Sequence, residues 1–252
     1  MLLSCYIRLI MKKRSTSILF KAITRNFLKI TIYYPKMVYM AFHREKYTVD
    51  QMYDYCLKMI RFAIDESGLK VEPHGLENIP EKDGFYICSN HQEKFDPLAI
   101  WYTFPRHVGV ILDDAVTHRP FIREVTRLIK SKRLVKRHTH SVVRAYSQIT
   151  KDLKAGENYM VFPEGGYETE PGKLGEFMPG SFKSPQRAHC PILPVAIVDS
   201  YKIFDRGFRT TLPIQVHYLK PISPEEYEGM STTEIAELVK GRIKAHLDIY
   251  QK

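Results

Sequence analysis

The chain has 252 residues, of which 44% are hydrophobic and 26% charged, so it can bury a large core and wholesale disorder is excluded. Its net charge of +10 is unevenly placed, because residues 1–47 carry +9, residues 119–144 carry +8 and the remainder carries −7. Two basic segments on a mildly acidic body indicate a polyanionic partner, which is a membrane surface, a phosphate group or a nucleic acid. The four cysteines form no Cys-x-x-Cys pair, which argues against a disulfide framework or a zinc site and favours a reducing compartment.

The first basic segment predicts a helix with two unlike faces. Apolar side chains gather on one side between Leu19 and Tyr34, whereas Lys21, Arg25 and Lys29 gather on the other. These charges leave no run of about 20 apolar residues, so a membrane-spanning helix is not expected. They also interrupt the apolar core that a secretory signal needs. A helix of this kind suits the surface of an anionic bilayer.

Three other interpretations of this segment stay open. The helix could pack on its own domain and keep its charged face in water. It could be a cleaved organelle-targeting segment, which is also amphipathic and poor in acids. The chain could also begin at one of three internal methionines, Met11, Met37 or Met40.

A second helix is expected directly after the basic segment. Thr48 and Gln51 form a capping-box pattern at its start, and Gly68 is expected to end it. The two helices define a basic, membrane-interfacial region at residues 1–68, and residues 69–252 form the main domain. We expect peripheral or monotopic attachment to the cytoplasmic face of a membrane.

In the main domain, short runs of β-forming residues alternate with helical patterns. Strands are predicted at 84–89, 107–112, 133–135, 159–162, 192–198 and 214–219. Helices are predicted at 97–103, 120–130, 140–155, about 180–188 and 232–249, with Gly156 closing the third and Ser231 and Glu234 capping the last. The alternation predicts an α/β fold with a mixed, largely parallel sheet flanked by helices. Ligands of such sheets bind beyond the strand ends.

Signatures of several common enzymes are absent from the sequence. The chain has no P-loop, no dinucleotide-binding glycine motif, no nucleophile elbow and no His-Glu-x-x-His motif. These absences argue against nucleotide hydrolysis, dinucleotide binding, serine hydrolysis and zinc proteolysis.

The first candidate site follows the strand predicted at 84–89. His91 and Asp96 lie five residues apart across a turn, so the carboxylate can accept one ring N–H while the other ring nitrogen acts as a general base. This arrangement activates a hydroxyl nucleophile. The spacing also has a purely structural interpretation, because an Asp directly before Pro97 is a good N-cap for the following helix.

Two further sites lie at predicted strands. Glu164 precedes the paired glycines Gly165 and Gly166, which let the backbone approach a ligand closely, and its carboxylate can accept a substrate hydroxyl. The structural alternative is a glycine turn with a solvated Glu. The segment from Pro191 to Val195 predicts a buried strand at an edge or a bulge, because its prolines cannot donate ladder hydrogen bonds.

The second basic segment lies between these sites in the sequence. Its charges comprise three arginines on one face of a predicted helix and five more around residues 133–135: Arg119, Arg123, Arg127, Lys130, Lys132, Arg133, Lys136 and Arg137. Guanidinium groups bind phosphate through two hydrogen bonds, so the segment is a candidate phosphate site beside His91. Alternatively, most of these charges are solvated or face a membrane.

Taken in order, these sites resemble the glycerolipid acyltransferase family that contains 1-acyl-sn-glycerol-3-phosphate (lysophosphatidate) acyltransferase. From about Gly75 to the C-terminus the chain shares four motifs with it: Asn90-His91-x4-Asp96, Leu134-Val135-Lys136-Arg137, Phe162-Pro163-Glu164-Gly165 and Pro191-Ile192-Leu193-Pro194. Two positions depart from the family pattern. Gly166-Tyr167 replaces the usual Thr-Arg, and Lys136 replaces an acidic residue, so Lys183 and Arg133 are candidates to supply the lost phosphate contact.

The resemblance implies an O-acyltransferase of phospholipid biosynthesis with no metal and no tightly bound cofactor. His91, oriented by Asp96, would deprotonate the sn-2 hydroxyl of lysophosphatidic acid, which attacks the thioester of acyl-CoA or acyl-carrier protein and gives phosphatidic acid. The phosphate would be held by Arg137, Arg133 and Lys183, and the glycerol by Glu164 and Gly165. Oxyanion donors are expected in the Glu164–Gly166 turn or in the Pro191–Pro194 segment. The expected binding partner is a membrane surface with anionic lipids, and no nucleic-acid partner is expected.

Two classes of alternative remain. The same chemistry could act on glycerol 3-phosphate, on another lysophospholipid or on a lyso-ornithine lipid. The chain could instead be a non-catalytic basic module that binds anionic lipid or nucleic acid. Against nucleic acid, no aromatic Phe, Tyr or Trp occurs between Ile122 and Arg144 to stack on bases.

Overall fold

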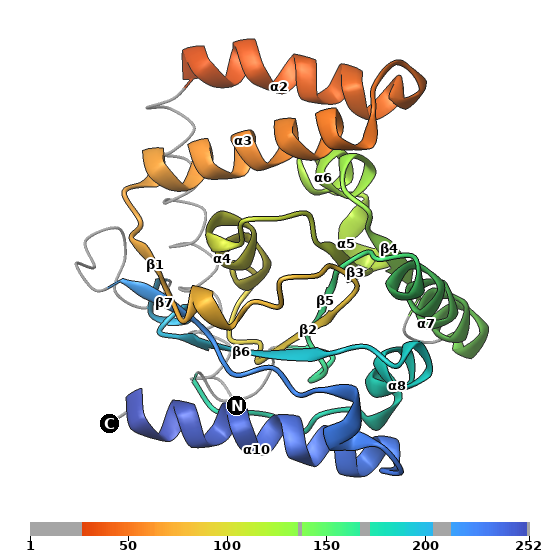
Figure 1. Ribbon diagram of the computed structural model, residues 1–252. Helices are drawn as coiled ribbons and strands as arrows, with labels where there is room; N and C mark the ends of the chain where they lie inside the picture. The colour runs from red at the N-terminus through yellow and green to blue at the C-terminus, as the bar shows by residue number, and fades with distance from the viewer. Residues whose placement is uncertain (1–26, 136–137, 167–171, 204–212, 251–252) are drawn as a thin grey trace, which may run out of the picture.

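The computed structural model describes residues 27–135, 138–166, 172–203 and 213–250, and its centre is a seven-stranded sheet (Figure 1). Its strands are β1 (Val71–His74), β2 (Tyr86–Ser89), β3 (Gly109–Asp113), β4 (Lys132–Leu134), β5 (Tyr159–Val161), β6 (Ile192–Val198) and β7 (Ile214–Tyr218). They lie in the order β1-β7-β6-β2-β5-β3-β4. The strands from β6 to β4 run parallel, whereas β7 pairs antiparallel with β6 and parallel with β1. The predicted mixed, largely parallel sheet is confirmed.

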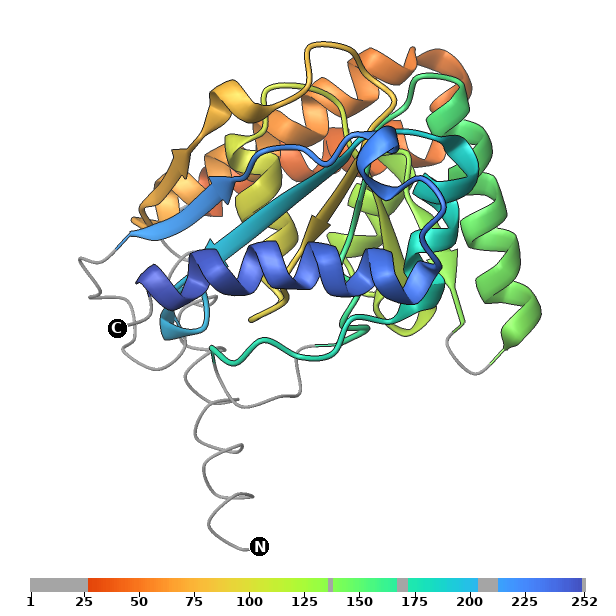
Figure 2. The same cartoon turned by 60° about the horizontal axis from the view of Figure 1, so that its bottom comes forward.

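Helices cover both faces of the sheet (Figure 1). One face carries α2 (Phe27–Phe42), α3 (Val49–Ser67), α4 (Asp96–Thr103) and α6 (Ile122–Leu128), and the other carries α7 (Thr139–Lys154), α8 (Lys183–Ala188) and α10 (Thr232–Tyr250). Figure 2 shows α10 lying across β6. The connections contain short helices: α5 (Asp114–Thr117), η1 (Arg44–Lys46), η2 (Leu76–Asn78), η3 (Pro179–Phe182) and η5 (Pro224–Tyr227).

Alternating side chains of the strands fill two hydrophobic cores. In β2, Ile87 points into the core beneath α3 and α4, whereas Tyr86 and Cys88 point into the core shared with α7 and α10. Strand β6 is buried at every position from Ile192 to Val198. A strand covered by helices on both faces is a continuous apolar run, which explains why the prediction at 192–198 matches β6 at both ends.

Helix α3 begins and ends as predicted. The Thr48 side chain accepts a hydrogen bond from the Gln51 backbone N–H, and the Gln51 side chain accepts one from the Thr48 backbone N–H. Gly68 ends the helix with a φ of 75°, which favours glycine. The other predicted caps are also present, because Ser231 and Glu234 exchange the same two bonds and Gly156 follows α7 with a φ of 85°.

Residues 19–26 of the predicted amphipathic helix lie outside the described residues, and its remainder, residues 27–34, forms the start of α2. Buried side chains of α2 and α3, such as Met37 and Ile60, belong to the same core as the sheet. The boundary predicted after residue 68 falls between α3 and β1. Within the described ranges, no helix combines the length and the hydrophobicity that crossing a bilayer requires.

Two local elements differ from the prediction. Strand β1 was not predicted because it has one buried residue and contains Pro73, so it lacks an apolar run. The helix predicted at 120–130 begins only at Ile122, and a separate short helix, α5, precedes it. The break falls at Pro120 and at Phe121, whose φ of 70° is not helical.

The Pro191–Val195 segment is not at an edge, because β6 lies inside the sheet between β7 and β2. Its pairing on the β7 side is irregular, since Val195 lies opposite Tyr218 and Ile192 bridges Ile222, so the partner segment has one extra residue, as in a bulge. The Pro194 carbonyl accepts a hydrogen bond from Leu219, just beyond the point where the ladder with β7 begins at Val195. The missing N–H of Pro194 therefore faces the β7 side, where only the reciprocal bond to Leu219 is lost, and pairing with β2 is undisturbed.

Candidate active site

His91 lies two residues beyond β2, at the edge of the sheet where the parallel strands end. Its Nδ1 atom is 2.7 Å from Oδ2 of Asp96, so the pair predicted from the sequence is formed. The Asp96 side chain is fully buried, and 14% of the His91 side chain is exposed. The ring of Phe162, which follows β5, packs against the His91 ring with 4.4 Å between centroids. The imidazole is thus fixed on one side and accessible on another.

Four donors surround the Asp96 carboxylate. Besides His91, the backbone N–H groups of Gln92 and Glu93 donate to Oδ2 at 2.6 and 2.8 Å, and the Ser200 hydroxyl donates to Oδ1 at 2.5 Å. The side chain makes no capping bond to α4, so the capping interpretation of Asp96 is wrong. It points back toward the turn that carries His91. These donors replace the water from which the buried carboxylate is removed.

This geometry fixes the imidazole tautomer. A carboxylate only accepts, so the hydrogen between the two side chains resides on Nδ1 of His91. The lone pair of the neutral ring is then on Nε2, which is the atom able to take a proton from a hydroxyl group. When that proton arrives, the adjacent Asp96 carboxylate stabilises the resulting imidazolium.

The turn that carries His91 is bound to the neighbouring strand by Asn90. Its amide nitrogen donates to the Ile197 carbonyl at 3.0 Å, and its amide oxygen accepts from the Ile197 N–H at 2.7 Å. Asn90 is only 2% exposed, so water does not compete for these bonds. The start of the His91 turn is therefore held against β6.

Glu164 joins two segments of the site through its carboxylate. Oε1 accepts the backbone N–H of His91 at 2.7 Å, and Oε2 accepts that of Gly175 at 2.8 Å. Burial raises the pKa of Glu164, and the two N–H donors oppose this increase. A Cβ atom on Gly175 would lie 2.6 Å from Oε2, so a side chain there would displace the carboxylate. The alternative of a solvated Glu164 is excluded.

Gly165 follows in the same turn with a φ of 69°. A Cβ atom there would lie 2.6 Å from the Cε atom of Met178, so both backbone conformation and space favour glycine. Gly166 has open space around it. Tyr167, which departs from the family pattern, lies outside the described residues.

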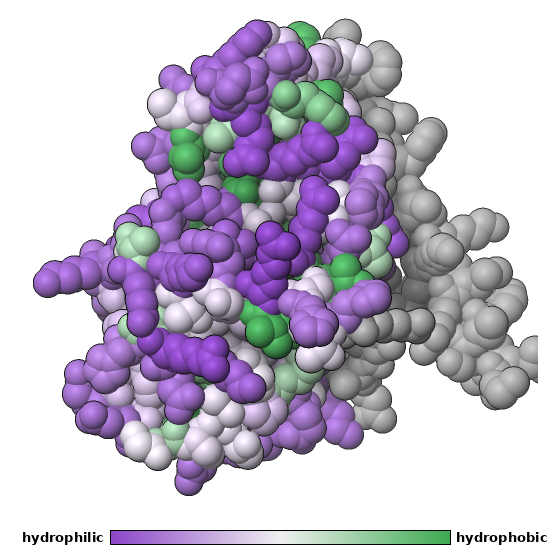
Figure 3. Space-filling view, turned by 90° about the vertical axis from the view of Figure 1, so that its right-hand side faces the viewer, coloured by the Kyte–Doolittle hydropathy of each residue, from purple (hydrophilic) through white to green (hydrophobic). Residues whose placement is uncertain are grey.

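Four of the eight charged side chains of the second basic segment have partners among the described residues. Arg123 pairs with the buried Glu124, and Arg123 and Arg127 both lie over the ring of Phe42, at 5.4 and 4.1 Å from its centroid. Two lysines also form ion pairs: Lys130 with Glu157 and Lys132 with Asp152. Hydrophilic side chains dominate this side of the molecule, over α6 and α7 (Figure 3). These four side chains therefore make structural contacts within the fold.

The predicted phosphate ligands are not gathered at His91. Arg133 is exposed on β4, which is separated from β2 by β5 and β3, a spacing of about 14 Å. Lys183 is exposed at the start of α8, close to Ser181, whose carbonyl accepts the hydroxyl of Tyr86 at the opposite end of β2. Arg137 lies outside the described residues. The structure thus groups His91 and Asp96 with Glu164 and Gly165.

Sequence reasoning missed Ser200, Gln92 and Phe162. Ser200 stands two residues after β6, at the same edge of the sheet as His91, and both lie beyond strand ends. The rule that selected His91 from its place after a strand applies equally to Ser200. Ser200 belongs to no recognisable sequence motif, so nothing in the local sequence distinguishes it from a solvated serine.

Known proteins are similar to this chain in both sequence and fold. A family model described as acyltransferase matches residues 70–198. The 1-acyl-sn-glycerol-3-phosphate acyltransferase of Borreliella burgdorferi is 26% identical over 181 residues, which cover 70% of this chain and 72% of that protein. For the corresponding alpha enzyme of Mus musculus the identity is 24%, covering 73% of this chain and 65% of that protein.

The crystal structure of the 1-acyl-sn-glycerophosphate acyltransferase PlsC from Thermotoga maritima has the same fold. It matches with a TM-score of 0.71 and 24% identity, and the match covers 94% of this chain and 98% of that one. The region matched by the family model spans half of the chain and contains the His91–Asp96 pair and the Glu164 turn. The chain belongs to the acyltransferase family, whose members include the 1-acyl-sn-glycerol-3-phosphate acyltransferases.

Proposed function

We propose that the chain transfers a fatty acyl group from acyl-CoA or acyl-carrier protein to the sn-2 hydroxyl of 1-acyl-sn-glycerol 3-phosphate and so produces phosphatidic acid. The observation that carries this proposal is the contact between His91 and the buried Asp96, 2.7 Å apart within the matched region. Two relatives named for this activity support the choice of acceptor.

The reaction follows from the tautomer of His91. Nε2 takes the proton of the acceptor hydroxyl while the oxygen attacks the thioester carbonyl. The tetrahedral intermediate collapses with cleavage of the carbon–sulfur bond, and the imidazolium returns its proton to the departing thiolate. Asp96 stabilises the positive charge of the ring between these steps, and no metal or bound cofactor takes part in them.

For the oxyanion we propose donors in the Glu164–Gly166 turn. The other expected segment, Pro191–Pro194, begins beside Tyr86 in the β2–β6 ladder, at the end of β2 opposite to His91. The N–H of Ile192 already donates to Ile222 at 2.9 Å. The Glu164–Gly166 turn lies on the same side as the imidazole, because Glu164 binds the His91 backbone directly.

The acceptor itself requires groups for its phosphate and its glycerol. We propose that Arg137, three residues after β4 in the sequence, contributes most of the phosphate binding. Arg133 and Lys183 lie away from His91 and are not part of the proposed phosphate site. Each oxygen of Glu164 has a second lone pair, so this carboxylate can also accept a glycerol hydroxyl. Gly165 leaves the backbone of the turn open to the substrate.

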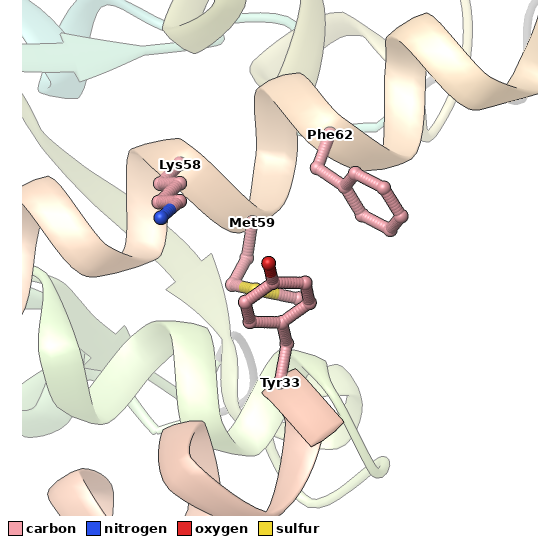
Figure 4. A pocket seen from close by; sticks show the side chains of 4 residues that line it. All are labelled: Tyr33, Lys58, Met59 and Phe62. Atoms are coloured by element: carbon pink, nitrogen blue, oxygen red, sulfur yellow. The ribbon is translucent and has the colours of Figure 1, made fainter. Parts of the chain in front are cut away.

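The helices α2 and α3 are the proposed surface for the membrane, on its cytoplasmic face. Ile32 of α2 is 68% exposed. A pocket of about 220 Å³ opens between the two helices and is lined by aromatic, apolar and basic side chains (Figure 4): Tyr33, Lys58, Met59 and Phe62. Exposed apolar residues beside cationic groups suit the boundary between lipid headgroups and acyl chains.

A pair of isoleucine substitutions tests this surface. Ile32→Asp should weaken co-sedimentation with vesicles of anionic phospholipid, because it places a charge among the proposed lipid contacts. The matched control is Ile249→Asp, since Ile249 is 65% exposed but lies on α10, on the other face of the sheet (Figure 1). Equal binding by the two variants would rule out α2 as the membrane surface.

The acceptor is tested with labelled acyl-CoA and a panel of hydroxyl compounds. We expect the purified chain to acylate lysophosphatidic acid at least tenfold faster than glycerol 3-phosphate, lysophosphatidylcholine or a lyso-ornithine lipid. Preference for another member would reassign the acceptor and keep the chemistry. No transfer to any of them, from either acyl-CoA or acyl-carrier protein, would refute the proposed function in favour of a non-catalytic lipid-binding module.

A further inference from the structure

The second oxygen of Asp96 is held by a residue far away in the sequence. Ser200 lies in the connection after β6, and its hydroxyl donates to Oδ1 at 2.5 Å. Both side chains are fully buried. A hydroxyl bonded to a buried carboxylate is a charge-assisted donor, which is stronger than one bonded to a neutral group.

The position of Ser200 is itself tightly specified. Gln92, the neighbour of His91, accepts the Ser200 backbone N–H through its side-chain oxygen at 3.1 Å. Asp199 adopts a φ of 67°, which is uncommon for a non-glycine residue, and its carboxylate pairs with Lys202 at 2.6 Å. A strained backbone persists only where surrounding contacts determine it, so the chain holds this serine in place from both sides.

We propose that Ser200 is a positioning residue for acyl transfer, which fixes the Asp96 carboxylate so that its other oxygen stays on Nδ1 of His91. The terminal torsion of an aspartate is broad, and rotation about the Cβ–Cγ bond moves both oxygens together, so a bond to Oδ1 adds to the bonds on Oδ2 in resisting that rotation. Oδ2 is bonded to the His91 ring and to two backbone N–H groups, and Oδ1 is bonded to Ser200. Loss of the Ser200 hydroxyl would release Oδ1 and disturb the orientation of the imidazole.

This inference rests on the proposed acyl transfer by His91, and a matched serine separates positioning from simple stability. Ser184 is also fully buried, and its hydroxyl donates to a single partner, the Tyr146 carbonyl, at 2.7 Å. Ser200→Ala and Ser184→Ala each remove one buried hydroxyl: that of Ser200 contacts Asp96 at 2.5 Å and the Gln92 side-chain oxygen at 3.2 Å, and that of Ser184 contacts one carbonyl. Only the first touches the carboxylate that orients His91.

The kinetic test compares Ser200→Ala, Ser200→Thr and Ser184→Ala with the wild type at temperatures where all are folded. Ser200→Ala should lower kcat about 10- to 100-fold, the scale of a small misplacement of a catalytic group, with both KM values changed less than twofold. Ser200→Thr retains the hydroxyl and should recover most of the rate. Ser184→Ala should keep the wild-type kcat. A kcat within twofold of wild type in Ser200→Ala, or an equal loss in Ser184→Ala, would overturn the proposal.

A spectroscopic readout makes the test independent of turnover. The Nδ1 proton of His91, bonded to a buried carboxylate, should give a downfield proton NMR resonance that is absent from His91→Gln. We expect it to shift or broaden in Ser200→Ala and to stay in place in Ser184→Ala; an unchanged resonance in Ser200→Ala would overturn the positioning role. A wild type that shows this resonance yet acylates no acceptor would refute the proposed function, and the resonance would still decide the role of Ser200.

Discussion

The edge of the sheet beyond β2 and the basic segment at 119–144 differ in how they use their charged groups. At the β2 edge, the Asp96 carboxylate accepts four hydrogen bonds, and all of them orient one imidazole. In the basic segment, Arg123, Lys130 and Lys132 are each neutralised by a neighbouring carboxylate. The first region concentrates its polar groups on one reactive atom, whereas the second distributes its charges among separate contacts.

This difference shows what charge counts and spacing can each predict. A net charge of +8 in 26 residues is a property of composition, and ion pairs formed in the fold can neutralise the side chains that contribute to it. The spacing of His91 and Asp96 is a property of geometry, because a single turn brings the two side chains together. Substitutions in the two regions should accordingly change different kinetic constants.

The largest effect is expected at His91. His91→Ala removes the base and should lower kcat by at least about 10³-fold, within the range that a positioned proton acceptor contributes. The side chain is not part of the hydrophobic core, so thermal unfolding and binding to anionic vesicles should stay near wild type. Transfer of a labelled acyl group measures the loss, and a kcat within tenfold of wild type would contradict the role of the β2 edge.

A smaller effect is expected at the partner carboxylate. Asp96→Asn preserves the shape of the side chain but removes the charge that stabilises the imidazolium and fixes its tautomer. We expect kcat to fall about 10²-fold with little change in either KM. Steady-state kinetics check this, and a change confined to KM would show that Asp96 acts on substrate binding instead.

The basic segment should respond in binding rather than in turnover. Arg137→Ala should raise the KM for lysophosphatidic acid about tenfold, the scale of one charge-assisted hydrogen bond, and leave the KM of the acyl donor unchanged. The matched control is Lys132→Ala, because Lys132 is already paired with Asp152 at 2.7 Å. An equal increase in both variants would mean that the segment acts through its total charge.

The smallest effect concerns stability at low pH. Unfolding in acid also removes activity, so it limits the pH range in which a loss of activity can be assigned to His91. Burial, together with His246 and His74, lowers the pKa of His217 to about 4. The Gln215 side chain and the Tyr250 ring also contact His217. A histidine in the unfolded chain has a pKa of about 6.5. The contribution of His217 to stability is therefore complete above that pH and is lost as the pH falls toward 4.

A histidine substitution checks this stability effect. His217→Gln cannot titrate, so its Tm should fall less steeply than that of the wild type between pH 6.5 and 4. Thermal unfolding followed by circular dichroism at several pH values measures both slopes. Identical slopes would show that other groups cause the loss of stability in acid.

Features encoded by neighbouring residues could be predicted from the sequence. The cap of α3 at Thr48, the buried run of β6 and the His91–Asp96 pair each depend on residues within one element or one turn. Features that depend on distant contacts could not. Ser200 and Asp96 are 104 positions apart in the sequence. Gly175 contacts Glu164 through its backbone N–H, a group that every residue except proline has, so the residue type does not indicate the contact.

The same reasoning explains the errors in the basic segment. Arg123 and Arg127 were expected to share a face, and both lie over one ring, but that ring belongs to Phe42 of α2. The periodicity of a helix shows which side chains point together, and it does not show what lies opposite. The partners come from the packing of α2 on α6, which is a tertiary contact.

The central claim is that His91 and Asp96 act as one unit, and a double-mutant cycle tests it most directly. Once the base is absent, a group that acts only by orienting it has nothing left to do, so the two losses should not add. We predict that the kcat of the double variant His91→Ala/Asp96→Asn equals that of His91→Ala within about threefold. A double variant slower than His91→Ala by the full factor lost in Asp96→Asn alone would contradict the claim.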